Sequence, residues 1–450
     1  MKSFGLSKRL KLAVCCGLFL CIGLNAPGYA QEDVSDRAQE SVRKKTSKEK
    51  KRKKRKSGFF YGNAGTGYRW NKGRSEIRLA GFMQLDTRGY FDDPADWGTD
   101  NFLLRRIQPS LEIKFNKTYS FFIMPSLGTT PGILDAYFEG QFTKPFNVRL
   151  GKFKSPFGLE RLQSATALAF NERAFPTNLA PNREIGGQVF GIVLWDTTEY
   201  QVGVFYGGVD NSSGLRGSVI SSNGNGVDFV VRIFSHPFKQ SRLDVLRGLG
   251  IGAAYSYGTQ QGNAERGESH LPTFLSSGQQ LIASYVRGAF ADGSRERIGP
   301  QLYYHYGPLG VMSEYTVSQQ NIKLGPVSDK VTHDAFQFQV SWVLFNGDAS
   351  FRRIRPDESM TLNNLGSGGA VQVAGRYSEL NLDHRAFDHG LFDPDRSIRK
   401  AQEWGVGVNW YLNRNVKFQL DYSQTHFTQG DSGGSRPEEK VLFSRMQLAF

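Results

Sequence analysis

The last eleven residues, KVLFSRMQLAF (Lys440–Phe450), alternate apolar and polar side chains almost to the final position. Successive side chains of a β-strand point to opposite faces of a sheet, so the stretch predicts a strand with one apolar face. The expected apolar face comprises Leu442, Met446, Leu448 and Phe450, and the expected opposite face comprises Val441, Phe443, Arg445 and Gln447. Chain ends are commonly polar and frayed, so a strand that runs to an aromatic end calls for a structural reason.

The same alternation continues through the body of the chain. From about Arg74 onward, short alternating runs such as EIRLAGFMQLDTRGY (76–90) and WGVGVNWYL (404–412) are separated by Gly, Asn, Asp and Pro. Helical periodicity is nearly absent. Aromatic residues make up 13% of the chain and glycine occurs 51 times, which suits a curved sheet with ring anchors and flexible corners. The sequence therefore predicts an all-β fold.

A soluble sandwich and a membrane barrel share this alternation, and three features favour the barrel. Runs of roughly 10–12 residues exceed the usual ~5–6-residue globular strand and match the ~9–11 residues that cross a bilayer at a tilt. Trp404 and Trp410 share one strand face and would lie roughly 20 Å apart, which suits the two aromatic girdles of an apolar band ~25 Å tall. Tight turns also alternate with long loops along the chain.

Counting every plausible strand gives an odd number, whereas bacterial single-chain barrels have an even one. The weakest candidate is Leu281–Phe290, which we assign to an outer loop spanning about 258–296. We therefore expect a 16-stranded antiparallel transmembrane β-barrel over residues 74–450. The last strand would pair with the first, so that neither edge is left open, and Phe450 would lie at the periplasmic rim.

The first 30 residues are expected to be a secretory signal. Lys8, Arg9 and Lys11 precede the apolar run LAVCCGLFLCIGL, and small residues stand before a cleavage point after Ala30. This run is shorter than the ~20 residues that span a membrane as a helix. Every cysteine lies inside it, which excludes disulfides, thiolate metal sites and a cysteine nucleophile from the remaining chain.

The net charge of +14 is concentrated near the start of the chain. Residues up to Ser57 contain 16 Lys and Arg against 5 Asp and Glu, which leaves 40 against 37 in the rest. We interpret residues 31–73 as a basic, disordered periplasmic segment, with a tether to an anionic polymer or lipid surface as the alternative. A nucleic-acid partner is not expected, because the signal directs this segment out of the cytoplasm.

Several stretches resemble the phosphate-selective porin O and P family over about residues 75–450. The first is VRLGKFKSPFGLERLQSATALAFNERAFPTNLAPNREIGGQVFG (148–191), which is similar to the region of the third loop in that family. Later strands of the family resemble PQLYYHYGPLGVMSEYTVS (300–318), AGRYSELNLD (374–383) and WGVGVNWYLNRNVKFQLDYSQTHF (404–427). The resemblance implies a homotrimeric outer-membrane porin whose third loop folds into the lumen.

That resemblance also implies passive diffusion of small anions such as phosphate, pyrophosphate or polyphosphate past Arg and Lys side chains. Guanidinium groups in a narrow polar lumen replace anion hydration with charge-assisted hydrogen bonds, and several weak sites in series allow release. In outer-membrane proteins generally, a final aromatic residue such as Phe450 looks like the signal read by the barrel-assembly machinery. We therefore expect that machinery, outer-membrane lipid and small anions as partners.

Charge counting alone does not indicate anion selectivity. By strand parity the expected inward basic residues are Arg78, Arg88, Arg106, Lys114, Arg149, Arg232, Arg376, Lys417 and Arg445, and the expected inward acidic residues are Asp86, Glu112, Asp135, Glu139, Asp228, Glu314, Glu403 and Asp421. Many of these would pair across the lumen. The candidate anion-binding residues are Arg161, Arg173, Arg183, Lys152 and Lys154 at the third loop, and Arg106, Arg149 and Arg232 on the wall.

Two alternatives remain open: a general non-selective diffusion porin, and a structural or adhesive outer-membrane barrel. An enzyme is not expected, because no G-x-S-x-G elbow or recognisable Ser/His/Asp pattern accompanies the seven histidines. The stretch DHRAFDHGLFDPD (383–395) is rich in His and Asp, but a polar loop explains it better than a metal site. We therefore expect no cofactor, no metal and no catalytic residue.

Overall fold

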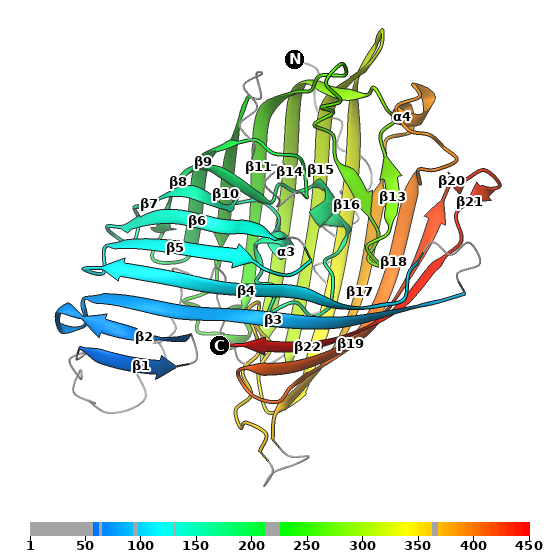
Figure 1. Ribbon diagram of the computed structural model, residues 1–450. Coiled ribbons are helices and arrows are strands. Elements are labelled where there is room, and N and C mark those ends of the chain that lie inside the picture. Colours follow the sequence, from blue (N-terminus) through cyan, green and yellow to red (C-terminus); the bar gives the residue numbers. More distant parts are fainter. Residues whose placement is uncertain (1–56, 63–64, 93–97, 130, 212–225, 362–367) are drawn as a thin grey trace.

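The computed structural model describes residues 57–62, 65–92, 98–129, 131–211, 226–361 and 368–450, and its main feature is a closed antiparallel barrel of sixteen strands (Figure 1). The barrel strands are β3 (Ser75–Phe91), β4 (Asn101–Phe115), β5 (Tyr119–Ser126), β6 (Gly132–Gln141), β7 (Asn147–Lys154), β8 (Arg183–Val193), β9 (Thr198–Tyr206), β10 (Val227–Ser235), β11 (Leu249–Gln261), β14 (Phe290–Tyr306), β15 (Leu309–Leu324), β16 (Val327–Phe345), β17 (Ala370–Asn381), β18 (Lys400–Tyr411), β19 (Val416–Thr428) and β22 (Glu439–Ala449). The predicted fold class and strand number are confirmed.

The barrel closes where the last strand meets the first. β22 pairs antiparallel with β3, from Lys440 opposite Phe91 to Ala449 opposite Phe82. One step further, Phe450 and Gly81 exchange both backbone hydrogen bonds, at 2.9 and 3.0 Å. The final residue is therefore part of the ladder, and this pairing is the structural reason for a strand that continues to the aromatic end.

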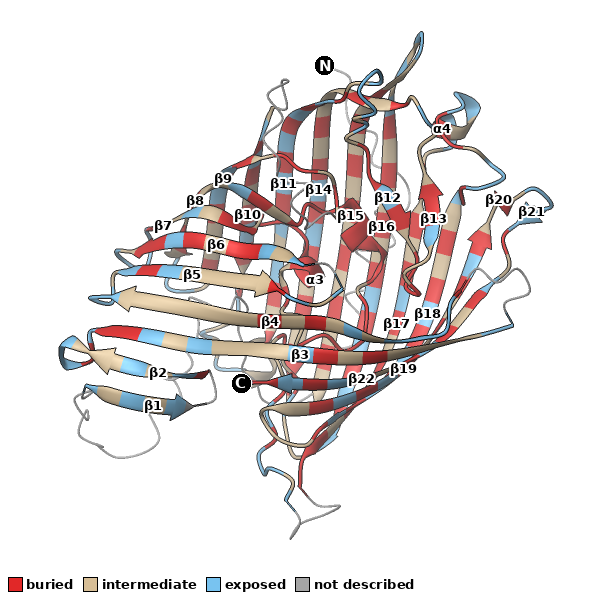
Figure 2. Cartoon of the chain, viewed as in Figure 1, coloured by how far each residue is buried: buried red, intermediate tan, exposed pale blue. Residues whose placement is uncertain are grey.

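The alternation of the last strand places its side chains as the sequence predicts. Arg445 and Gln447 are buried on the inner face, whereas Met446 and Leu448 are exposed on the outer face. Buried and exposed residues alternate along most strands (Figure 2), as one expects of a sheet whose outer surface is apolar and whose inner surface is filled.

The weakest candidate, Leu281–Phe290, is not a barrel strand: its first residues form β13 (Leu281–Ser284), which pairs with β12 (Thr273–Leu275) inside the connection between β11 and β14. That assignment to a loop is confirmed. The connection covers residues 262–289 and is shorter than expected, because β14 begins already at Phe290.

The described strands begin before the predicted boundary at residue 74. β1 (Gly58–Gly62) and β2 (Gly65–Trp70) form a hairpin, and β2 pairs with β3 from Ser75 to Leu79. The prediction of a disordered segment is therefore wrong for these two strands. Residues 31–56 and the expected signal at residues 1–30 lie outside the described residues.

In the part of the chain that the structure describes, helices are few and short. They are η2 (Asn71–Gly73), α3 (Leu159–Leu162), η3 (Phe175–Leu179), η5 (Asp244–Leu246) and α4 (His384–Asp388). No helix in the described ranges is long and apolar enough to cross a membrane.

The largest apolar cluster lies among three long connections at one end of the barrel, residues 155–182, 262–289 and 382–399. Its members from these connections include Phe175, Phe274 and Phe392, which pack with residues on the adjoining ends of β15, β16, β17, β18 and β19. The three connections therefore support one another and keep a fixed position relative to the wall.

Candidate functional site

Residues 155–182 are almost entirely buried and contact strands on several sides of the barrel. They connect β7 to β8 and form the third connection at the end that carries the long loops. Gln84 on β3 and Lys417 on β19 donate to backbone carbonyls of this segment at 3.1 and 2.9 Å, and Glu314 on β15 accepts a backbone N–H at 2.5 Å. Such contacts are those expected of a loop that folds into the lumen.

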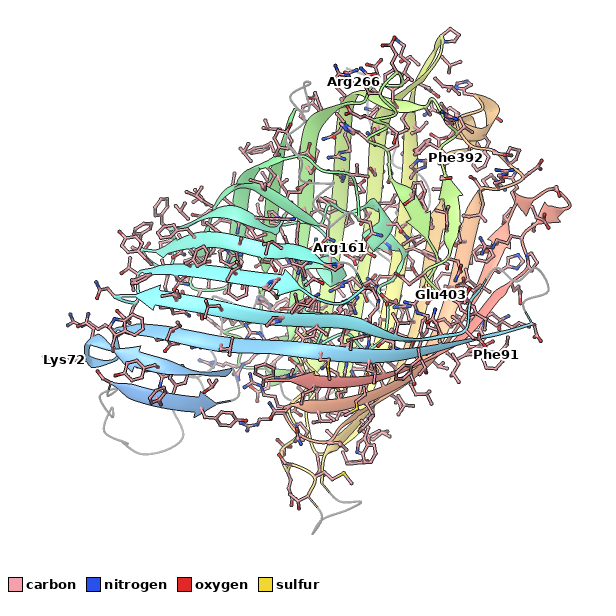
Figure 3. The ribbon with its side chains drawn as sticks, in the orientation of Figure 1. Lys72, Phe91, Arg161, Arg266, Phe392 and Glu403 are labelled. Atoms are coloured by element: carbon pink, nitrogen blue, oxygen red, sulfur yellow. The ribbon has the colours of Figure 1, made fainter. Side chains whose placement is uncertain are left out.

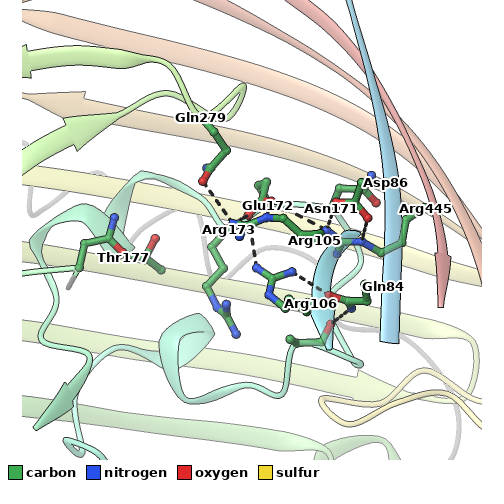
Figure 4. A network of polar contacts seen from close by, with 12 residues as sticks. Gln84, Asp86, Arg105, Arg106, Asn171, Glu172, Arg173, Thr177, Gln279 and Arg445 are labelled. Atoms are coloured by element: carbon green, nitrogen blue, oxygen red, sulfur yellow. Dashed lines mark hydrogen bonds and ion pairs between the residues drawn. The ribbon is translucent and has the colours of Figure 1, made fainter. Parts of the chain in front are cut away.

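Glu172 of this segment is the centre of a network of arginine side chains (Figure 4). Its carboxylate accepts from Arg105 Nε at 2.6 Å and from Arg105 Nη2 at 3.1 Å. Three more guanidinium groups, those of Arg106, Arg88 and Arg445, lie 3.5, 3.7 and 3.8 Å from it. The planar fork of arginine suits such shared contacts with carboxylate oxygens.

This network carries more positive than negative charge. Arg445 also binds Asp86, at 2.7 and 2.6 Å, so four guanidinium groups share two carboxylates, which leaves a formal surplus of two. Burial opposes ionisation of Glu172, but the charges of Arg105 and Arg106 outweigh it and hold the pKa of Glu172 well below its usual range. The carboxylate stays ionised at neutral pH, and the surplus positive charge remains.

Two of the predicted loop residues, Arg161 and Arg173, form no ion pair with any other described residue (Figure 3 labels Arg161). Arg161 Nη2 donates to the Thr177 carbonyl at 2.5 Å and to Asn211 at 2.6 Å, and Arg173 donates to two backbone carbonyls at 2.9 and 2.8 Å. Arg161 Nε is buried without a partner in the described part of the chain. Burial, followed by the charges of Arg173 and Arg183, lowers the pKa of Arg161. A bound anion would relieve this mutual repulsion.

The other predicted loop-region residues differ in their surroundings. Arg183 forms a two-point pair with Asp135, at 3.1 and 3.2 Å, so its charge is compensated. Lys154 donates to carbonyls of the 155–182 segment, whereas the buried Lys152 ammonium has no partner among the described residues.

The three predicted wall residues do not form one group. Arg106 donates to Gln84 at 2.8 Å and belongs to the Glu172 network, beside Arg173 in Figure 4. Arg149 pairs with Glu139 at 2.6 Å, and Arg232 donates to Gln201 on the adjacent strand β9 and to Gln301 on β14. Arg106, Arg161 and Arg173 thus lie around the 155–182 segment, while the Arg149 charge is matched by a neighbouring carboxylate.

Sequence parity misses Arg105, the closest partner of Glu172. The ladder between β3 and β4 shifts register between Gln84 and Leu85, where Gln84 lies opposite Arg106 and Leu85 lies opposite Leu104. Arg105 is the extra residue of this β-bulge, and a bulge re-aims its side chain. Two adjacent arginines on one strand can therefore both reach Glu172. The only sequence feature that could have indicated this cluster was the Arg105–Arg106 pair itself.

A second arginine group was missed because residues up to 296 were assigned to a loop. Arg295 and Arg297 on β14 are almost fully buried and both bind Asp228, at 2.6 and 3.1 Å. Arg297 also pairs with Asp210, and Arg295 donates to the Gly208 carbonyl at 2.8 Å. With two charges of each sign, this group secures the start of the 207–226 connection rather than adding a positive field.

The opposite mouth of the barrel also contacts the third connection. Phe351, in the connection between β16 and β17, packs in one cluster with Leu159, and its carbonyl accepts from Gln163 at 2.6 Å. The next residues, Arg352 and Arg353, bring two further basic side chains to this region. The connection is long although it lies at the end with the tight turns, which the sequence pattern did not predict.

The stretch rich in His and Asp forms the polar loop that the sequence predicts. Asp383 caps α4 by accepting from the Arg385 N–H at 3.1 Å, and His389 Nδ1 lies 3.0 Å from Asp329. Within the described ranges, no group of three or more His, Asp, Glu or Cys residues is arranged to hold a metal ion.

A closed barrel with an apolar outer surface and a buried, positively charged segment among its strands defines an outer-membrane porin, and the protein therefore resides in the bacterial outer membrane. A family model described as phosphate-selective porin O and P matches residues 77–450. The chain belongs to this family, as its sequence resemblance predicts. Comparison with curated proteins finds no significant match.

Solved structures with a similar fold are outer-membrane proteins. The outer membrane channel DcaP of Acinetobacter baumannii is 11% identical, with a TM-score of 0.54 over 86% of this chain and 100% of that one. An anion-selective porin from Comamonas acidovorans is 9% identical, with a TM-score of 0.52 over 84% and 100%. OmpT of Vibrio cholerae is 8% identical, with a TM-score of 0.51 over 84% and 98%. At these identities the likeness concerns the fold alone.

Proposed function

We propose that this porin is a water-filled channel for passive diffusion of small anions, with phosphate, pyrophosphate or polyphosphate as the preferred solutes. The main support for this proposal is that Arg161 and Arg173 have no carboxylate partner among the described residues. Both lie in the 155–182 segment, which also contains Glu172. Phosphate oxygens would accept the hydrogen bonds that these guanidinium groups now direct mainly to neutral oxygens.

Three further features support this assignment. The Glu172 network has a surplus of two positive charges, so an anion approaching the segment meets a favourable potential. Lys152 offers a buried ammonium group without a partner among the described residues. Several separate donors in series would allow an anion to bind weakly at each and to leave again. Lys154, Arg106, Arg183, Arg149 and Arg232 complete the proposed set.

The test is the reversal potential of single channels in a planar bilayer with a salt gradient. We expect anion selectivity in the wild type and a clear shift toward cations in the double variant Arg161→Gln, Arg173→Gln. The matched control is Arg266→Gln, Arg396→Gln, which removes the same charge from exposed positions on the long connections. Because salt at ~0.1–1 M screens exposed charges over about 3–10 Å, the control should keep a reversal potential close to that of the wild type. Equal selectivity in all three proteins would contradict the proposal.

The same measurement separates the two alternatives. A general diffusion porin gives a wild-type reversal potential near zero, and a structural or adhesive barrel gives no unit conductance. We also propose a homotrimer, with support from a solved trimer form of Vibrio cholerae OmpT, which is 7% identical. The proposed activity is the passage of anions through the channel and not a catalysed reaction. We propose that the barrel-assembly machinery inserts the chain into outer-membrane lipid.

A further inference from the structure

The inward-facing side chains of the barrel differ in exposure from one side of the wall to the other. On β17, β18, β19 and β22 every inward-facing side chain is buried, and the charged Arg376 and Arg445 are only 4% and 2% exposed. On β3, β4, β5 and β7 several inward-facing side chains are partly exposed, and much of β4 is intermediate in Figure 2. Neighbouring copies of a trimer would contact the outer surface of the barrel, so they would leave these inward-facing side chains uncovered. The open part of the lumen therefore lies along the first strands.

The partly exposed part of this inner wall includes one row of residues that runs across four strands near the tight turns. Arg78 on β3 lies opposite Glu112 on β4. Phe122 on β5 lies between Glu112 and Tyr137, because it is opposite Glu112 on one side and opposite Tyr137 of β6 on the other. Directly opposed residues of neighbouring strands share one face of a sheet. These four side chains therefore form a continuous row on the inner surface.

Apolar side chains occupy part of this row and the wall beside it. The rings of Phe122 and Tyr137 are stacked, with their centres 5.2 Å apart and their planes at 26°. Tyr137 is buried against Phe153, whereas Phe122 is partly exposed. Met124, two positions further along the same face of β5, is partly exposed as well. The lumen of an outer-membrane barrel is ordinarily polar, so this ring and thioether give a solute in the lumen an apolar surface to contact.

Basic side chains flank the apolar surface on both sides. On one side, Lys114 of β4 binds Glu112 at 2.7 Å, and Arg78 of β3 lies 3.6 Å from the same carboxylate. On the other side, the guanidinium group of Arg149 on β7 lies 4.4 Å from the centre of the Tyr137 ring. Such a contact is attractive because the face of an aromatic ring is electron-rich. The apolar surface is therefore bordered by cationic groups in both directions along the wall.

In these ion pairs the basic side chain is nearer to the water than its acidic partner. The side chains of Lys114 and Glu112 are 22% and 13% exposed, and those of Arg149 and Glu139 are 15% and 2% exposed. Each base has an acidic partner, but a solute in the lumen meets the basic groups first. The recessed carboxylates fix the orientation of the basic groups, which direct their positive potential toward the water.

We propose that this inner wall is a second solute site, which favours organic anions that carry an aromatic or other apolar part. The apolar part lies against Phe122 and Met124, and the anionic group binds one of the flanking bases Arg78, Lys114 and Arg149. An inorganic anion gains only the charge contacts at this site, whereas an aromatic anion also removes apolar surface from water. The inference rests on the proposed passage of anions and names a further class of solute for it.

The test compares phenyl phosphate with methyl phosphate as blockers of the single-channel chloride current, at a pH where both are dianions. The two compounds carry the same charged group and differ in the ring. We expect phenyl phosphate to block the wild type at a roughly 2–10-fold lower concentration, which is the gain expected of one aromatic contact. Phe122→Leu should lose most of this difference, and Phe122→Tyr, which keeps the ring, should retain it. The matched control is Phe121→Leu, which makes the same change one position away on the exposed outer face and should behave as wild type.

A charge variant separates the contribution of the bases from that of the ring. Lys114→Gln should weaken the block by both compounds and leave the ratio of their blocking concentrations near the wild-type value. Heat-dependent gel mobility confirms that the barrel of each variant is folded. Equal block of the wild type by the two compounds, or an unchanged ratio in Phe122→Leu, would overturn the proposal. A channel that phenyl phosphate blocks better, but that shows no anion selectivity in the salt gradient, would support this site and contradict only the proposed selectivity.

Discussion

Arg445 on β22 and Asp86 on β3 face each other across the closure of the barrel and form a two-point ion pair at 2.7 and 2.6 Å, with both side chains fully buried. The pair joins residues 359 positions apart in the sequence. It therefore couples the first and last strands electrostatically at the position where their backbones already pair.

Breaking this pair should destabilise the barrel. Asp86→Asn leaves a buried guanidinium group without its main partner, and removing one member of a buried pair costs about 3–5 kcal/mol of unfolding free energy. The measurement is urea unfolding in detergent micelles. Lys440→Gln at the exposed Lys440–Asp92 pair on the same seam is the control and should leave stability unchanged. An Asp86→Asn protein as stable as wild type would contradict the expectation.

Glu172 should make the stability of the protein dependent on acid pH. Its pKa in the folded protein is lower than in the unfolded chain, so its contribution is complete above the unfolded value of about 4.3 and is lost as pH falls below it toward the folded value. Glu172→Gln should cost about 1.5–3 kcal/mol at neutral pH, as expected for hydrogen bonds to a charged group.

The measurement is the unfolding free energy of both proteins at a series of pH values. The difference between wild type and Glu172→Gln should be constant near neutrality and should shrink below pH ~4.3. Glu265→Gln, at an exposed position on the 262–289 connection, controls for the loss of one negative charge. A difference that does not change with pH would show that the Glu172 carboxylate is not the titrating group.

Phosphate should compete with chloride for the pore. In a chloride bath, adding phosphate is expected to lower the wild-type single-channel current, because the proposed anion-binding residues Arg161 and Arg173 would hold phosphate longer than chloride. The double variant Arg161→Gln, Arg173→Gln should lose this inhibition, while Arg266→Gln, Arg396→Gln retains it. Inhibition of equal depth in both variants would place the phosphate site elsewhere.

The closed sheet should also resist detergent. Unheated protein is expected to migrate on a denaturing gel faster than the unfolded chain, or as an oligomer, and boiling should convert it to a single slower monomer band. A reference sample unfolded in urea before loading gives the position of the open chain. Identical mobility before and after boiling would contradict a barrel held by continuous strand pairing.

Period-two alternation was sufficient to predict the sheet and the face of the sheet on which each side chain lies. A shift of one residue would move every side chain of a strand to the opposite face, so an alternating pattern allows only one of the two arrangements. It assigned Arg445 inward and Met446 outward correctly. It failed at Arg105, where a bulge adds one residue to the strand. It also passed over the β1–β2 hairpin, whose short, glycine-rich strands follow a basic run that reads as disorder.

The candidate site was harder to predict than the fold. Parity shows which charges face inward but not which of them meet, since Arg105 and Glu172 are 67 positions apart and come together only in the closed barrel. Arg161 and Arg183 looked alike in the sequence, yet only Arg183 has a carboxylate directly beside it in the described structure. The distinction depends on tertiary contacts, which no local pattern encodes.

The third connection is tethered to strands that are synthesised long after it. Lys417 reaches the Leu168 carbonyl from 249 positions downstream, and Asn409 reaches the Ala169 carbonyl from 240 positions downstream. Contacts of such long sequence separation form late, because the intervening chain must first be ordered. During biogenesis the third connection is therefore among the last parts to settle, and a chain interrupted before β18 would lack the contacts that hold this segment to β18 and β19.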